Sequence, residues 1–219
     1  MKEGLYMNKR EKTLRWSFFL TGLVILGLGI TLTIKGQQLG IGPWDVLHVG
    51  LFQQFGLTVG TWAILVGALI IGLTVLMTKK PPRIGAILNM LLIGVFIDFF
   101  NWLIPEPQSI VGATAILLAG IIVSGYGVGI YVSANLGEGP RDTIMMMIVR
   151  KTGWNVSKVR RSIEIVALAI GWLLGGPVGI GTILIAFFTG TIVNLSLPQS
   201  QLALTKLLAK DTKPAAYHA

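Results

Sequence analysis

The sequence contains no cysteine, and only two of its 219 residues are histidine. The absence of cysteine excludes a disulfide framework, a thiol nucleophile and cysteine-ligated zinc or iron–sulfur sites. Charged residues make up only 12% of the chain, against about 25% in an ordinary soluble domain. Too few polar side chains remain to cover a water-exposed surface, which excludes a soluble enzyme.

The motifs of the common hydrolases and nucleotide-binding enzymes are missing as well. The sequence has no HExxH, no Gly-x-Ser-x-Gly and no P-loop, and only His48 lies near an apolar segment. We therefore expect no enzymatic activity, no catalytic residues, no metal site and no cofactor.

Apolar residues and glycine fill the chain instead. Hydrophobic residues account for 53%, glycine for 28 residues, and the mean hydropathy is +0.75. A helix needs about 17–25 apolar residues to cross the bilayer, and six runs reach or approach that length. The sequence thus predicts an all-α, polytopic membrane protein in a lipid bilayer, with spans at 16–35, 59–78, 84–104, 111–133, 159–175 and 178–197.

Basic residues set the expected orientation of these spans. The formal net charge is +9, which in a soluble protein would suggest nucleic acid. With a cytoplasmic N-terminus, however, 17 of the 18 lysines and arginines fall in cytoplasmic segments, and only Lys35 falls on the other side. The positive-inside rule therefore predicts that both termini are cytoplasmic, and no nucleic-acid partner is expected.

Two apolar segments, 43–55 and 140–149, are too short to cross. Each follows a Gly-x-Gly and opens with proline, which favours the first turn of a helix because its missing N–H costs nothing there. Both are expected to be short re-entrant or interfacial helices.

The chain also contains an internal repeat. The run Leu39–Asp45 (LGIGPWD) matches Leu136–Asp142 (LGEGPRD), and further along Asp98 matches Asn194. The interpretation is one repeat at 16–104 and a second at 111–197, between a basic N-terminus at 1–15 and a tail at 198–219. Three spans per repeat is an odd number, so the second repeat is expected to be inverted relative to the first. Inverted repeats with discontinuous helices are typical of secondary transporters.

The two Gly-x-Gly-Pro-x-Asp motifs predict a site. Gly42 and Gly139 fall at the N-caps of the short helices, with proline at the first helical position. Free N–H groups at a helix N-terminus favour an anion, and in a bilayer they must be buried or line an aqueous cavity. The predicted substrate-binding residues are Gly40, Gly42, Pro43, Trp44, Asp45, Asp98, Gly137, Gly139, Pro140, Arg141 and Asp142.

Other interpretations of the acidic residues remain open. Asp45 and Asp142 can simply cap their own helices; they would then repel an anion, and a cation or proton would couple better. Asp98 is either an intramembrane functional group or an interfacial residue paired with Lys35. His48 lies three residues after Asp45, which suits a proton relay or a solvated histidine.

The runs LGIGPWDVLHVGL, GLTVGTW and LGEGPRD resemble those of the YczE/YyaS/YitT group of bacterial integral membrane proteins, most closely the YczE type. The resemblance covers about residues 16–197. It implies a multi-pass protein of the bacterial plasma membrane; because the group has no settled biochemical activity, no catalytic residues are carried over from it, and it is silent on the substrate.

Two functions follow from these patterns. The first is secondary transport of a small polar or charged solute by alternating access. The second is a non-transporting membrane factor that supports or regulates another system through the loop 134–158 and the tail. Glycines such as Gly125 and Gly129 permit close helix approach within one chain or between two, so a homodimer is a further expectation.

Overall fold

The computed structural model describes residues 8–137 and 139–209, and within that part every regular element is a helix. One 3₁₀ turn, η1 (Gln37–Leu39), follows the first helix. The other elements are α1 (Lys9–Lys35), α2 (Pro43–Phe55), α3 (Val59–Thr78), α4 (Ile84–Leu103), α5 (Ile110–Ser133), α6 (Pro140–Thr152), α7 (Val156–Leu173) and α8 (Ile180–Ala209).

Five of these helices are long and apolar enough to cross a membrane: α1, α3, α4, α5 and α8. The sequence predicted six. The remaining candidate, α7, has the length of a short span, but it carries Lys158, Arg160, Arg161 and Glu164 in its first half. That charge separates it in composition from the other five.

The helix ends differ from the expected spans in two places. The first helix begins at Lys9 instead of Trp16, because the basic residues before the apolar run are compatible with helix. The last helix continues through Pro198 to Ala209, where the sequence predicted a separate tail from 198. Proline has no N–H and removes one backbone hydrogen bond, but α8 continues through Pro198.

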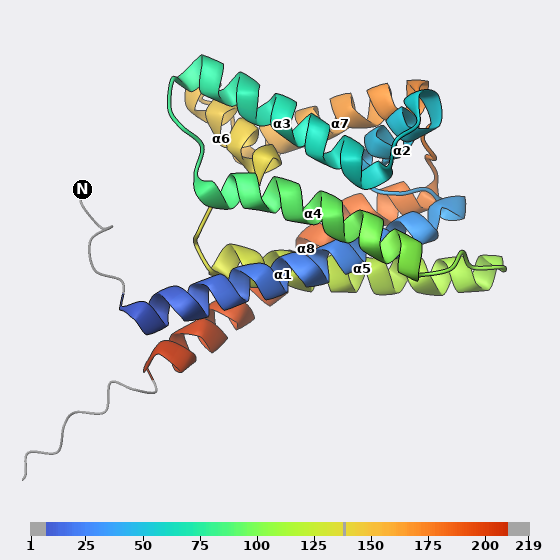
Figure 1. The fold of residues 1–219 in the computed structure, drawn as a ribbon. Coiled ribbons are helices and arrows are strands. Elements are labelled where there is room, and N and C mark those ends of the chain that lie inside the picture. Colours follow the sequence, from blue (N-terminus) through green and yellow to red (C-terminus); the bar gives the residue numbers. More distant parts are fainter. Residues whose placement is uncertain (1–7, 138, 210–219) are drawn as a thin grey trace, which may run out of the picture.

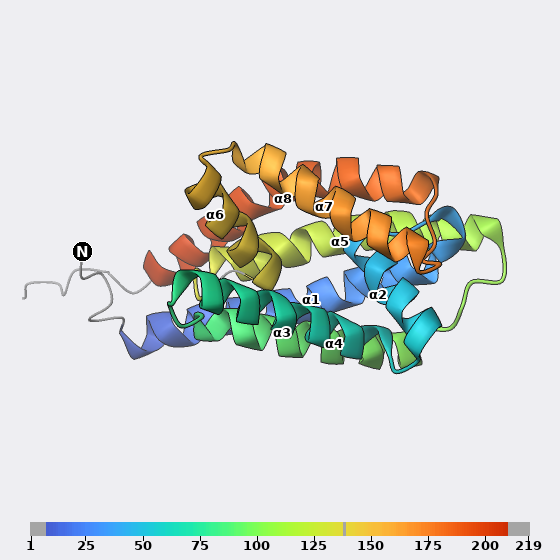
Figure 2. The same cartoon turned by 90° about the horizontal axis from the view of Figure 1, so that it is seen from above.

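Figures 1 and 2 show the long helices running side by side in two layers. One layer contains α1, α4, α5 and α8, and the other contains α2, α3, α6 and α7. The short helices α2 and α6 lie at opposite ends of the second layer (Figure 2). The start of α1 and the end of α8 meet, with the Arg10 guanidinium donating to the Leu207 carbonyl at 3.3 Å.

Helices α1 and α5 form the most extensive contact in the fold. Glycines on both helices make it possible, since a Cβ at any of four positions would collide with the backbone of the other helix. The four contacts are Gly22 with Tyr131, Gly29 with Ser124, Gly120 with Thr33, and Gly127 with Leu26.

Both short helices begin as the motifs predicted. Gly42 and Gly139 are the N-caps, with extended backbone, and Pro43 and Pro140 occupy the first turn. Two residues before each N-cap, at the first glycine of the Gly-x-Gly, the backbone has a positive φ: Gly40 has φ +91° and Gly137 has φ +148°. L-residues rarely adopt such angles, so these two positions require glycine.

The two outer helix pairs are packed unequally. Helix α3 packs along α4, where Gly94 contacts Gly60 and Ile64. Helix α7 makes no comparable contact with α8. In the described part of the chain, a Cβ at Gly190 would meet no atom within 4 Å.

Candidate functional site

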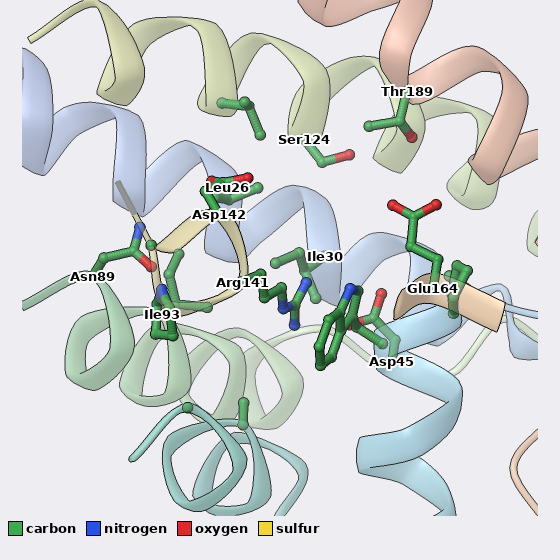
Figure 3. Close-up of a pocket in the computed structure, with 18 of the residues that line it drawn as sticks. Leu26, Ile30, Asp45, Asn89, Ile93, Ser124, Arg141, Asp142, Glu164 and Thr189 are labelled. Carbon is green, nitrogen blue, oxygen red and sulfur yellow. The ribbon is translucent and has the colours of Figure 1, made fainter. Parts of the chain in front are cut away.

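A cavity of about 260 Å³ lies between the two layers, and residues from all eight α-helices line it. Figure 3 shows its charged and polar side chains converging from α2, α6 and α7 against apolar residues of α1 and α4. Ligand pockets in proteins commonly measure about 300–1,000 Å³. The cavity is therefore suited to a small solute.

Most of the residues that the sequence proposed as a site line this cavity. They come from both Gly-Pro-x-Asp motifs, so segments nearly a hundred residues apart meet at one place. These residues are Gly42, Pro43, Trp44, Asp45, Gly139, Pro140, Arg141 and Asp142.

Gly40, Gly137 and Asp98 are not among the described residues that line the cavity. Gly40 packs on the backbone at Gly179, and Gly137 packs on the start of α4. These two glycines fix the loops that precede the short helices. Their proposed role in binding a solute would therefore be indirect.

Asp98 holds the start of α3. Its Oδ2 accepts a hydrogen bond from the Thr58 hydroxyl at 2.5 Å, and its Oδ1 accepts from the Gly60 N–H at 2.9 Å. Lys35, considered above as its partner, instead pairs with Glu106 at 2.8 Å. The pairing of Asp98 with Lys35 was wrong, and its partners are the first-turn groups that a helix leaves unsatisfied.

Replacing Asp98 with alanine is expected to lower the thermal midpoint of the purified protein, at a cost of about 0.5–2 kcal/mol for a lost helix cap. Glu11→Gln is the matched control, because Arg15 and Glu11 keep 23% and 30% of their side chains exposed and such i,i+4 ion pairs contribute little. Thermal unfolding in detergent measures both variants. An unchanged midpoint for Asp98→Ala would contradict the capping role.

Arg141 is the central cation of the cavity. Its guanidinium lies over the Trp44 ring, 4.8 Å from the ring centroid. Figure 3 shows the side chain extending from α6 toward Asp45 on α2. The neighbouring Asp142 accepts from the Tyr131 hydroxyl at 3.5 Å. The second residue of α2, Trp44, thus contacts the second residue of α6, Arg141.

Asp45 and His48 are buried with unsatisfied polar atoms. The side chains lie on one face of α2, as expected, with Asp45 Oδ1 and His48 Nδ1 4.0 Å apart. That separation is too long for a hydrogen bond. Asp45 is 7% exposed and His48 1%, and among the described residues neither atom has a hydrogen-bond partner. Asp45 Oδ1 therefore caps no N–H of its own helix.

Burial sets the protonation of this pair, which belongs to α2 and not to a spanning helix. Desolvation raises the pKa of the Asp45 carboxyl to about 6, against the opposing effect of the nearby Arg141 guanidinium. Desolvation, with a smaller contribution from Arg141, lowers the pKa of His48 well below its usual value. His48 is consequently neutral near pH 7, and the charge of Asp45 changes within a pH unit or so of neutrality.

Several cavity residues were missed in the sequence. Arg160 and Glu164 are four residues apart and form a local ion pair at 3.0 Å, and both also line the cavity. Asn89 lies next to Gly139, and Thr189 contributes a buried hydroxyl without a hydrogen-bond partner in the described structure. Asn89 and Thr189 could have been found in the sequence as polar residues within apolar runs.

The chain matches a family described as a family of unknown function, DUF6198, over residues 13–198. It is 54% identical to the uncharacterized membrane protein YczE of Bacillus subtilis over 204 residues, covering 93% of this chain and 95% of that protein. An uncharacterized protein of Haemophilus influenzae is 33% identical over 185 residues, covering 83% and 82% of the two chains. The uncharacterized protein YyaS of Bacillus subtilis is 27% identical over 188 residues, covering 84% and 93%. No solved structure matches. The resemblance to the YczE/YyaS group is thus confirmed.

Proposed function

This membrane protein belongs to DUF6198, a family of unknown function, and we propose that it is a secondary transporter. It moves a small polar or charged solute across the bacterial plasma membrane by alternating access. The observation that carries this proposal is the buried polar cavity where the N-termini of α2 and α6 meet. Discontinuous helices with their N-termini at a central site are the usual construction of such transporters.

In this transporter, residues 16–104 and 111–197 are inverted repeats of three crossings each, and α7 is the sixth crossing. Glycine contacts that occur in equivalent pairs support this arrangement. When each residue of a glycine contact is replaced by its counterpart in the other repeat, 96–98 residues away, the result is again a contact. The pairs of contacts are Gly22–Tyr131 and Gly120–Thr33, Gly29–Ser124 and Gly127–Leu26, Gly27–Phe96 and Gly125–Ile192, and Gly85–Leu136 and Gly181–Leu39.

The unequal outer pairs support alternating access. Helices α3 and α4 correspond to α7 and α8 in the repeat, and Gly94 corresponds to Gly190. Gly94 is packed against Gly60 on α3, whereas Gly190 is not packed against α7. In a transporter whose central site is open to one side only, the two equivalent halves have different conformations. Exchange of these two conformations opens the site to the other side.

Accessibility of one cavity residue from both sides tests the proposal without a known solute. Ser124 lines the cavity, and Ser124→Cys introduces the only thiol in the chain. We expect an impermeant maleimide to label it both in right-side-out and in inside-out membrane vesicles. Labelling from one side alone would overturn alternating access. It would favour the other function, a non-transporting factor that acts through the loop 134–158 and the tail.

A further inference from the structure

Among the described residues, three carboxylates and two cationic side chains line the cavity. Its charged groups are Asp45, Asp142, Glu164, Arg141 and Arg160. Arg160 and Glu164 form an ion pair at 3.0 Å, and Asp142 accepts a hydrogen bond from the Tyr131 hydroxyl, whereas the Asp45 Oδ1 atom has no hydrogen-bond partner among the described residues. Buried charges are stable only when they are paired, so the site as built favours an additional positive charge.

The negative charge without a hydrogen-bond partner lies on Asp45. Asp45 is 93% buried and, among the described residues, its Oδ1 atom accepts no hydrogen bond. The Nδ1 atom of His48 is 4.0 Å away and is likewise without a partner. An unsatisfied carboxylate oxygen in a cavity wall is an acceptor for a donor that the protein does not itself supply.

A cation-binding surface lies next to that oxygen. The Trp44 ring holds the Arg141 guanidinium at 4.8 Å from its centroid, which is the geometry in which aromatic rings bind organic cations. Apolar residues such as Ile30, Ile93 and Met90 complete the wall. An inorganic ion needs no such apolar and aromatic lining, whereas a small organic cation does.

We infer that the transported solute is a small organic cation, bound between the Trp44 ring and the Asp45 carboxylate, and that it competes there with Arg141, whose guanidinium lies over the same ring. The inference deepens the proposed transport function and rests on it. Arg141 then acts as a tethered competitor: its guanidinium occupies the Trp44 ring between transport steps, and its positive charge lowers the cost of burying Asp45 without a direct partner.

Binding of methylguanidinium to the full-length protein in detergent tests the inference, with acetate as the anionic probe. A ligand that binds the folded state raises the thermal midpoint in a concentration-dependent way. We expect methylguanidinium at millimolar concentrations to raise the midpoint and acetate to leave it unchanged. Asp45→Asn and Trp44→Leu should each weaken methylguanidinium binding about tenfold or more, the loss typical of a buried charge or stacking partner. Glu106→Gln, which removes a carboxylate outside the cavity, should bind as the wild type does.

Arg141→Gln separates the two possible roles of the arginine. If Arg141 competes with the solute, its removal strengthens methylguanidinium binding by about tenfold. If instead it binds an anionic solute, the same variant loses acetate binding. Arg141→Lys serves where the glutamine variant fails to fold, because it keeps the charge and weakens the contact with the ring; we expect it to bind methylguanidinium more tightly than the wild type.

The outcomes distinguish this inference from the proposed function. Binding of acetate but not of methylguanidinium, or of neither, overturns the cation site and leaves the two-sided labelling of Ser124→Cys unaffected. Binding of methylguanidinium together with one-sided labelling overturns transport and retains a cation-binding protein.

Discussion

A disulfide between cysteines introduced at Ser157 and Gly190 is expected to form in native membranes and to trap the protein in one conformation. These residues are the counterparts of Gly60 and Gly94, which pack directly against each other where α3 meets α4. In the described conformation α7 and α8 make no comparable contact. Exchange of the two halves would bring α7 against α8 near Ser157 and Gly190, as α3 lies against α4 at Gly60 and Gly94, and a disulfide forms once the two Cβ atoms come within about 3.5–4.5 Å of each other.

The expected change is nearly all-or-none. Oxidation should protect both thiols from a maleimide-coupled polymer that shifts the band on a gel, and reduction should restore both. Uptake of methylguanidinium into proteoliposomes should fall to the level of empty liposomes on oxidation and recover with reductant. The chain has no native cysteine, so no other disulfide confuses the result.

The control pair is Ser157→Cys with Ile183→Cys. Ile183 is on the same helix as Gly190, seven residues earlier, and hence about 10 Å away along the axis. This pair should stay reduced, as should each single variant. If the Ser157 and Gly190 thiols also stay reduced, α7 and α8 never approach as α3 and α4 do, and the exchange of conformations is refuted.

Cysteines at positions 57 and 154 are expected to react from opposite sides of the membrane. Leu57 follows α2 and Trp154 follows α6, and they occupy equivalent positions of the two repeats. Both are accessible, with 60% and 46% of the residue exposed, and α2 and α6 lie at opposite ends of the second layer (Figure 2). The charge distribution predicts that position 57 is outside and position 154 is cytoplasmic.

An impermeant thiol reagent on intact cells should therefore label Leu57→Cys fully and Trp154→Cys only after the membrane is permeabilised. These positions are better reporters than Trp44 and Arg141, which line the cavity and react according to its conformation. Labelling of both positions in intact cells would show that the repeats share one orientation. The inverted repeat, and with it the main argument for transport, would then be abandoned.

Local chemistry made the short helices and their meeting predictable. Proline after glycine places a helix start without reference to any other part of the chain, and both starts fall where the motifs put them. The ion pair of Arg160 and Glu164 follows from helical spacing alone. The convergence of Asp45 and Arg141 required one further step, the assumption that two related motifs meet at one site.

Tertiary contacts decided the rest. Asp98 could be assigned to a binding site because an acidic residue in an apolar helix suggests function, and only the packing of α4 on the start of α3 shows its hydrogen bonds to Thr58 and Gly60. Glu164 lines the cavity because its face of α7 is turned toward the cavity, and only the tertiary packing of α7 decides this. No pattern within α7 distinguishes a residue that faces the cavity from one that only pairs with its neighbour.

The glycine contacts between α1 and α5 also bear on the order in which the chain folds during synthesis. The two helices are nearly a hundred residues apart in the sequence, and their backbones touch at four glycines. While only residues up to Leu103 have entered the bilayer, Gly22 and Gly29 of α1 have no α5 to pack on, although Gly27 already packs on Phe96 of α4. The first half is thus an unfinished unit, and insertion of α5 completes the packing of α1.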